Sequence, residues 1–223
     1  MREALLYDLR HSPACTKARI CLQLKGVPYR RVPPSIGDVL RGPQVPWLVL
    51  EDETVVPAER IGSHLDAHHP DPPLVPADAE ARAYCSLLEG WADASLGAAV
   101  ERSVWGPPAS RHRMARAVAR EVTSGPLITL VAAVLARRAA RLACAAADAR
   151  ELLRERVVVL EAVLGERTFL LGKTLSRADV AAFAQLACVR RAAEDVPLEC
   201  GPALAAWMHR LAADPAVESA FEP

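Results

Sequence analysis

Hydrophobic and polar positions divide the chain into a first part with both strand and helix patterns and a second part with helix patterns only. Short apolar runs in the first part predict four strands, at residues 4–7, 29–32, 47–50 and 54–56. Apolar residues at helical spacing predict helices at 16–25 and 59–68, with one or two helical turns at 35–40. The order of elements is therefore β-α-β, a loop, and then β-β-α.

The second part follows a proline-rich stretch, HHPDPPLVPAD. Its four prolines interrupt any helix and stiffen this connection between the two parts. Beyond it we find no strand pattern, and apolar spacing predicts helices at 79–101, 111–122, 127–144, 149–164, 178–194 and 202–213. We therefore expect an α/β domain over residues 1–70, a linker at 71–78 and an all-helical bundle over 79–223.

One helix start in the second part is strongly specified. Ser176 is a good N-cap residue, and Asp179, three positions later, can reach back as in a capping box. Leu175 and Val180 are placed to form a hydrophobic staple across the same turn. We interpret this pattern as a folding signal rather than a catalytic one.

Composition narrows the class of protein. Lys plus Arg and Asp plus Glu number 27 each, so the net charge does not favour nucleic acid as a partner. The apolar run that starts at Pro126 meets Arg137 and Arg138 too soon to span a bilayer, and no secretory signal is visible. The six cysteines are scattered and form no C-x-x-C pair, which is typical of proteins in a reducing compartment. We expect a cytoplasmic protein without a nucleic-acid or membrane partner.

The stretch RHSPAC, residues 10–15, joins the first predicted strand to the first predicted helix. Ser12 is a preferred N-cap, and Pro13 has the φ angle of a first helical turn. A helix N-terminus presents free N–H donors and favours an anion, and a thiolate is such an anion. Two interpretations remain open from the residues alone: Ser12 is only a cap, or it faces a bound thiol.

The order of elements and four segments together resemble the cytosolic glutathione transferase superfamily over nearly the whole chain. The segments are SPACTKARICLQLKGVPY from Ser12, QVPWLV from Gln44, RIGSHLDAHHPDPPLVPAD from Arg60, and LSRADVAAF from Leu175. The resemblance implies a thioredoxin-like N-terminal domain with a four-stranded mixed sheet and helices, followed by the helical domain. It also implies glutathione as co-substrate, a small apolar electrophile as second substrate, and a homodimer.

The resemblance implies roles for particular residues. Ser12 corresponds to the catalytic serine that donates a hydrogen bond to the glutathione sulfur in serine-type members. The Val45–Pro46 bond is expected to be cis, with the backbone of Val45 on the cysteinyl part of glutathione and Gln44 near its glycine end. A proline that simply begins a strand is the alternative.

Two positions depart from the family pattern. The acidic residue and serine that bind the γ-glutamyl group correspond here to Pro57 and Ala58, whose side chains neither donate nor accept a hydrogen bond. Losing one or two hydrogen bonds to charged groups weakens binding by roughly tenfold to a thousandfold. Another small thiol, or none, therefore remains an alternative to glutathione.

The resemblance also assigns an electrophile pocket to Trp91 and Trp105, for which core packing is the alternative. Cys15 corresponds to the second cysteine of a redox pair whose first member is serine here, and we expect it to be a buried packing residue. His64 and His68 have the spacing of a metal-binding pair, but histidines at a helix C-terminus need no metal, and we predict none.

The sequence thus predicts a glutathione transferase-like enzyme that joins a thiol to a small apolar electrophile. Two alternatives remain. One is a binding or scaffold protein that has the fold without the chemistry, and the other is a thiol-dependent isomerase or dehalogenase on the same site.

Overall fold

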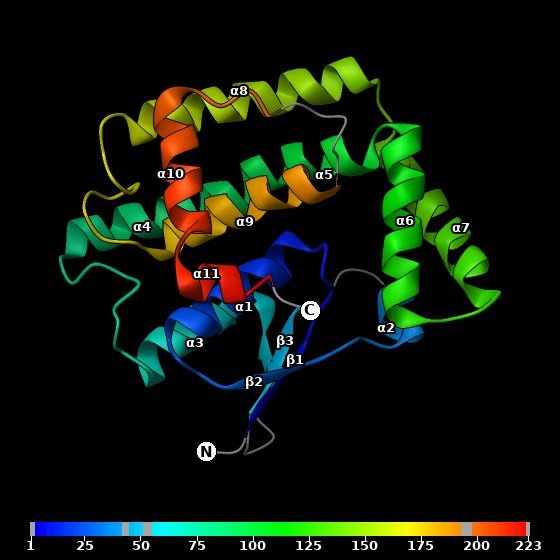
Figure 1. Cartoon of the computed structure of the whole chain (residues 1–223), viewed down its shortest axis with the longest axis horizontal. Coiled ribbons are helices and arrows are strands. Elements are labelled where there is room, and N and C mark those ends of the chain that lie inside the picture. The colour runs from blue at the N-terminus through cyan, green and yellow to red at the C-terminus, as the bar shows by residue number, and fades with distance from the viewer. Residues whose placement is uncertain (1–2, 42–44, 51–54, 193–197, 222–223) are drawn as a thin grey trace.

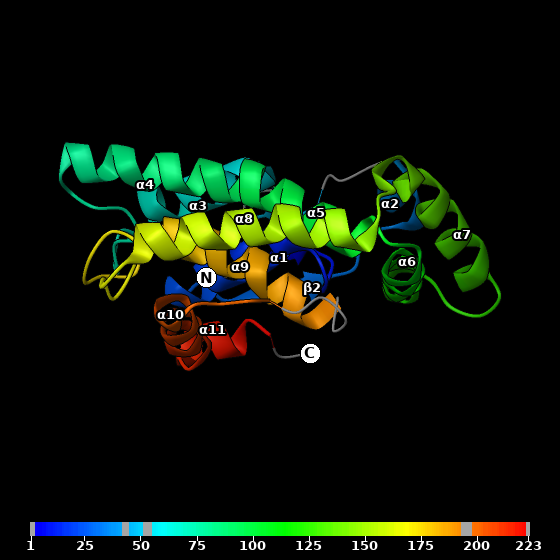
Figure 2. The same cartoon turned by 90° about the horizontal axis from the view of Figure 1, so that it is seen from above.

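The computed structural model describes residues 3–41, 45–50, 55–192 and 198–221 and has a layered arrangement. A four-stranded sheet forms one layer, helices α1 and α3 cover it, and the helices of the second part lie beyond them (Figure 1). The view from above shows α6 and α7 projecting at one end of the molecule, next to α2 (Figure 2). The predicted fold class, a mixed α/β unit followed by a helical one, is confirmed.

The sheet has the strand order β2-β1-β3-β4. Strand β1 runs parallel to β2 and antiparallel to β3, and β3 runs antiparallel to β4. The strands are β1 (Ala4–Tyr7), β2 (Tyr29–Val32), β3 (Trp47–Val49) and β4 (Val55–Pro57). They agree with the predicted strands to within one residue, apart from the predicted start of β4 at Thr54, which lies outside the described residues.

The helices of the first part are α1 (Pro13–Leu24), α2 (Ile36–Arg41) and α3 (Ala58–His68). Helix α1 is three residues longer at its start than predicted, because Pro13 fits the first turn of a helix that Ser12 caps. The buried side chains of Ile61 and Leu65 hold α3 against the core, as their spacing predicted.

The second part contains α4 (Ala79–Trp91), η1 (Ala92–Leu96), α5 (Gly97–Trp105), α6 (Pro108–Val122), α7 (Leu127–Ala139), η2 (Ala140–Leu142), α8 (Ala146–Leu164), α9 (Arg177–Ala192), α10 (Pro202–Ala212) and α11 (Pro215–Ser219). The single helix predicted at 79–101 is therefore interrupted by one π-helical segment, η1, and continues to Trp105. The short helix α11, which Asp214 caps, was not predicted.

The segment after α3 has neither helix nor strand up to Asp78. Its backbone is tied to α1 by Lys25, whose ammonium donates to the carbonyl of Pro72 at 2.7 Å and pairs with Asp66 at 2.8 Å. Leu74 is buried in the same region. The domain boundaries at residues 70 and 79 remain a prediction.

Helix α9 lies at the centre of the molecule and packs against α1, α4 and α5. Nearly every residue from Ala178 to Val189 is buried, which is typical of a helix surrounded by other elements. Five of these twelve residues are alanines, whose small side chains let neighbouring helices approach closely. In the part of the chain that the structure describes, no helix is both long and apolar enough to cross a membrane.

Asp179 fixes the start of α9. One carboxylate oxygen, Oδ2, accepts from the backbone N–H and the hydroxyl of Ser176, at 3.0 and 2.6 Å. The other, Oδ1, accepts from the backbone N–H of Leu170 at 2.8 Å and the indole N–H of Trp207 at 2.9 Å. Asp179 therefore reaches back to Ser176 as predicted, and it also links α10 and the loop at Leu170 to α9.

The substitution Asp179→Asn should destabilise the protein strongly, because it turns one acceptor oxygen into a donor that faces two donors. We expect the free energy of unfolding to fall by about 2–4 kcal/mol. Asp78→Asn is the matched control: the side chain of Asp78 accepts from the backbone N–H of Ala81, and Asn caps a helix equally well. Urea unfolding of both variants checks this, and equal stabilities would contradict it.

Candidate functional site

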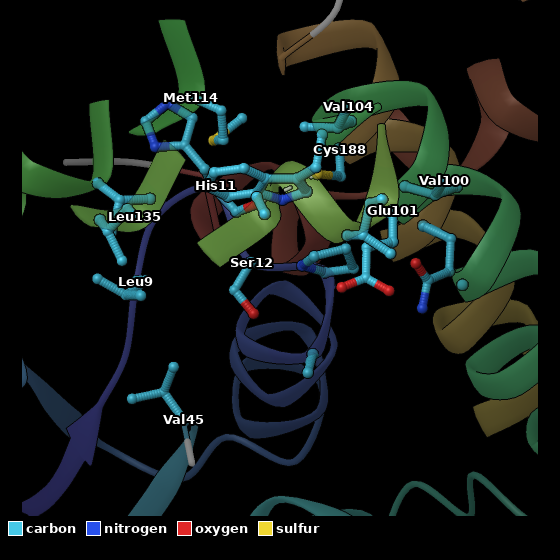
Figure 3. Close-up of a pocket in the computed structure, with 18 of the residues that line it drawn as sticks. Leu9, His11, Ser12, Val45, Val100, Glu101, Val104, Met114, Leu135 and Cys188 are labelled. Carbon is cyan, nitrogen blue, oxygen red and sulfur yellow. Dashed lines mark hydrogen bonds between the residues drawn. The ribbon is translucent and has the colours of Figure 1, made fainter. Parts of the chain in front are cut away.

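A cavity of about 590 Å³ lies between the first part of the chain and the helices of the second. The loop before α1, helix α2 and the start of β3 form one side, and α5, α6, α7 and α9 form the other (Figure 3). Its apolar lining includes Leu9, Val39, Val45, Trp47, Val100, Val104, Trp105, Met114, Val118, Leu135 and Leu142. A volume of this size is typical of sites for small molecules.

Ser12 lies at the N-terminus of α1 and lines this cavity. It is the N-cap, with extended backbone, and its hydroxyl accepts a hydrogen bond from the backbone N–H of Cys15 at 3.4 Å. Figure 3 shows this hydroxyl turned toward the start of α1. The cavity therefore contains a hydroxyl beside a helix N-terminus, an environment that favours an anion.

A buried ion pair holds the segment that precedes Ser12. The guanidinium of Arg19 on α1 donates to Asp8, at the end of β1, at 2.8 Å, and both side chains are almost fully buried. Arg19 also donates to the carbonyl of Arg10 at 3.2 Å and to the hydroxyl of Thr16 at 2.9 Å. Arg31 donates to the second oxygen of Asp8 at 3.2 Å. These bonds fix the backbone between β1 and α1.

Two side chains of the helical part hold the same segment from the other side. Glu121 at the end of α6 accepts from the backbone N–H of Arg10 through one oxygen and lies 2.7 Å from Nδ1 of His11 through the other. The thiol of Cys188 on α9 donates to the carbonyl of His11 at 3.1 Å. Burial raises the pKa of Cys188 to about 12, so this thiol keeps its proton.

Cys15 lies three residues after Ser12, in the first turn of α1, and has no access to solvent. Its sulfur accepts from the backbone N–H of Leu9 at 3.3 Å, and burial raises its pKa to about 12. A thiol in this environment is not a nucleophile near neutral pH. These observations favour the packing role that we expected for this residue.

The Val45–Pro46 peptide bond is cis, as the resemblance implied. Val45 lines the cavity across from Ser12, Pro46 is buried, and the ring of Trp47 stacks on Tyr7 with centroids 4.6 Å apart. Gln44, predicted to lie near the glycine end of the thiol, is outside the described residues.

Pro57 and Ala58 are not brought to the cavity lining. Pro57 is exposed and precedes α3 without a side-chain capping bond, and Ala58 is the first residue of that helix. Neither is among the described residues that line the cavity. Because their side chains are apolar, neither residue offers a side-chain hydrogen bond to a ligand.

Of the two predicted electrophile-pocket residues, Trp105 lines the cavity and Trp91 does not. Trp91 ends α4 and packs, half-buried, against the core. The cavity wall on this long helix begins only with Asp93 and Ala94 of η1 and continues into α5. Trp91 therefore lies just before the wall, and its role in an electrophile pocket stays a prediction.

A charged cluster supports the π-helical segment beside the cavity. The ammonium of Lys17 on α1 pairs with Asp93 of η1 at 2.6 Å and with Glu89 of α4 at 2.8 Å. Burial alone would lower the pKa of Lys17, but the attraction of the two carboxylates outweighs it, and the pKa is raised. The cluster therefore links α1 to the helix that carries this wall of the cavity.

Sequence reasoning missed His11, Trp47, Met114 and Leu135 among the lining residues. His11 could have been found, because it directly precedes Ser12. The others depend on how α6, α7 and β3 fold over the turn, which no local pattern specifies. In the described residues no group of three metal-ligating side chains exists, and the rings of His64 and His68 stack on each other.

The chain belongs to the glutathione transferase superfamily. Residues 6–73 match the family model for the glutathione S-transferase N-terminal domain, and residues 126–215 match that for the C-terminal domain. The predicted family is confirmed, and the chain is a glutathione transferase-like protein. No curated protein sequence matches the chain significantly.

Solved structures share the fold along nearly the whole chain. A glutathione S-transferase domain-containing protein from Marinobacter aquaeolei is 25% identical, with a TM-score of 0.68 over 96% of this chain and 99% of that one. A beta-etherase from a Sphingobium strain is 22% identical, with a TM-score of 0.74 over 99% of both chains. A Methylobacterium radiotolerans glutathione S-transferase in complex with glutathione sulfonate is 23% identical, with a TM-score of 0.71 over 99% and 95%.

Proposed function

We propose that this protein is a glutathione transferase that joins the sulfur of glutathione to a small apolar electrophile. The observation that carries the proposal is the position of Ser12, an N-cap hydroxyl that lines an otherwise largely apolar cavity. Family membership supports glutathione as the thiol, and the Methylobacterium relative binds an analogue of it.

The turn at Ser12 supplies the means to activate a thiol. The free N–H groups and the dipole at the start of α1 stabilise a thiolate, and the hydroxyl of Ser12 donates to the sulfur. The thiol loses its proton, the sulfur forms a bond to the electrophilic carbon, and the leaving group departs with the bonding electrons. Holding both substrates in one cavity makes the step effectively unimolecular.

The proposed glutathione pose follows the residues that face the cavity. The backbone of Val45, exposed by the cis bond to Pro46, is the proposed partner of the cysteinyl group, and Gln44 is proposed near the glycine end. Pro57 and Ala58 leave the γ-glutamyl group to the backbone N–H groups at the start of α3. The apolar wall that includes Trp105 would hold the electrophile.

One observation favours a second function. Pro57 and Ala58 offer no polar side chain to the γ-glutamyl group. A protein of this fold that binds ligands without conjugating them would not need such side chains. An isomerase or dehalogenase would use the same thiolate, since the shape of the apolar wall selects the electrophile.

We propose that the protein is located in the cytoplasm, because all six cysteines are free thiols, as is usual for proteins of reducing compartments. Fractionation of cells that produce the protein checks this proposal.

We expect Ser12→Ala to lower kcat/KM for conjugation of an aryl halide by about tenfold to a hundredfold, the value of one hydrogen bond to a charged group. Ser63→Ala is the control, because Ser63 lies on the exposed side of α3 and its hydroxyl donates to the carbonyl of Arg60. Equal rates for Ser12→Ala and the wild type would show that Ser12 is only a cap.

A second prediction concerns the γ-glutamyl end. Cysteinylglycine, which lacks the γ-glutamyl group, should bind within about tenfold of glutathione, because no side chain at positions 57 and 58 recognises that group. Calorimetry of both thiols with the same protein measures the ratio. A preference for glutathione of a thousandfold or more would overturn the proposed pose, and no binding of either thiol would favour the non-catalytic function.

We also propose a homodimer, the state implied by the family, through the exposed face of α4. Tyr84 and Leu87, one turn apart on α4, are 54% and 68% exposed. Leu87→Glu should convert the dimer to a monomer in light scattering. Leu130→Glu on α7, where the native side chain is 61% exposed, is the matched control and should leave the mass unchanged. A monomeric wild type would refute the proposal.

A further inference from the structure

His11 brings an imidazole to the lining of the cavity. Its side chain lines the cavity and is 30% exposed, whereas Glu121, its partner, is 15% exposed. Nδ1 of the ring lies 2.7 Å from Oε1 of Glu121. Among the described residues, the other ring nitrogen, Nε2, has no hydrogen-bond partner.

The pair has a defined protonation pattern. When Glu121 is ionised it is only an acceptor, and Nδ1 of His11 then carries the proton in this hydrogen bond. Nε2 is then a base when the ring is neutral and an acid when it is charged. Glu121 holds the ring in one orientation, as a carboxylate does for a catalytic histidine in other enzymes.

The ring serves the electrophile side of the cavity rather than the sulfur side. In Figure 3 the side chain of His11 extends toward Met114 on α6, whereas the hydroxyl of Ser12 is turned toward the start of α1. Its neighbours there, Met114 and Leu135, are apolar, so the ring is a polar group on the wall proposed to hold the electrophile.

A purely structural clamp would not need the imidazole. Glu121 already ties α6 to this turn by accepting from the backbone N–H of Arg10 at 2.7 Å, and Cys188 ties α9 to the carbonyl of His11 at 3.1 Å. The ring adds a second nitrogen, Nε2, on a residue that lines the cavity, and a carboxylate orients this ring.

We infer that His11 is a catalytic residue that protonates the oxygen leaving carbon in an oxygen-leaving electrophile such as an epoxide, and that Glu121 positions it. The inference rests on the proposed function and adds a catalytic residue to it. Halides leave as stable anions and need no proton, whereas an alkoxide is a strong base that leaves well only when it is protonated.

The proposed step balances. The thiolate sulfur at Ser12 forms a bond to one carbon of the epoxide ring, and the carbon–oxygen bond breaks. The oxygen takes the proton from Nε2 of His11, so the product carries a thioether and a neutral hydroxyl. His11 regains a proton from the solvent, which receives one when the next thiol ionises. No oxidant or reductant is needed.

The test compares two electrophiles that are attacked at a benzylic carbon. With glutathione, 4-nitrobenzyl chloride releases chloride, and 4-nitrostyrene oxide generates an alkoxide. General acid catalysis typically contributes about a hundredfold or more to rate. We therefore expect His11→Gln to lower kcat/KM for the epoxide by about a hundredfold and for the chloride by less than about threefold.

Two further variants separate chemistry from structure. Glu121→Gln offers one acceptor oxygen to two donors, so it loses either the bond from the Arg10 N–H or that from Nδ1 of His11, and should lower the epoxide rate by more than the chloride rate. His112→Gln removes an exposed histidine of α6 whose Nδ1 binds the carbonyl of Pro108, and should change neither rate. The chloride rate also shows that each variant is folded.

The outcomes are distinguishable. Equal losses on both electrophiles would make His11 a structural clamp and overturn the inference, as would an unchanged epoxide rate or a wild type that uses the chloride but not the epoxide. A wild type that conjugates neither electrophile and binds no thiol would instead remove the proposed function, and the inference with it.

Discussion

The site depends on one physical constraint: the backbone between β1 and α1 must be held so that Ser12 caps the helix and also faces the cavity. The buried Asp8–Arg19 pair provides this within the first part, and Glu121 and Cys188 provide it from the helical part. A buried ion pair needs further bonds to offset its desolvation, and here Arg10, Thr16 and Arg31 supply them. The same bonds that stabilise these charges therefore also position the serine.

The cavity is a product of the two parts together. The sheet side contributes Ser12 and Val45, while α5, α6 and α9 contribute the apolar wall and the contacts that hold the turn. The π-helical segment η1, supported by the Lys17 cluster, brings Asp93 and Ala94 to the wall. This arrangement separates the thiol end, where the helix N-terminus favours an anion, from the electrophile end, where apolar side chains and His11 meet.

The sequence predicted most of what is local. The strands, the start of α9 at Ser176 and the cap at Ser12 follow from apolar spacing and capping residues, and they agree with the structure. The π-helical segment and the exclusion of Trp91 from the cavity could not be predicted, because they depend on how α4 and α5 pack on α1. The partnership of His11 with Glu121 joins residues 110 positions apart, so only the tertiary fold reveals it.

The central claim is that the turn at Ser12 stabilises a thiolate, and the pKa of the thiol of bound glutathione tests it most directly. Titrating the ultraviolet absorption of the thiolate in the complex gives this value. For the wild type we expect it to lie about one to two pH units below that of a free thiol, about 8.5, and to return toward it in Ser12→Ala. A bound thiol that titrates like free glutathione, or equally in both proteins, would contradict the account.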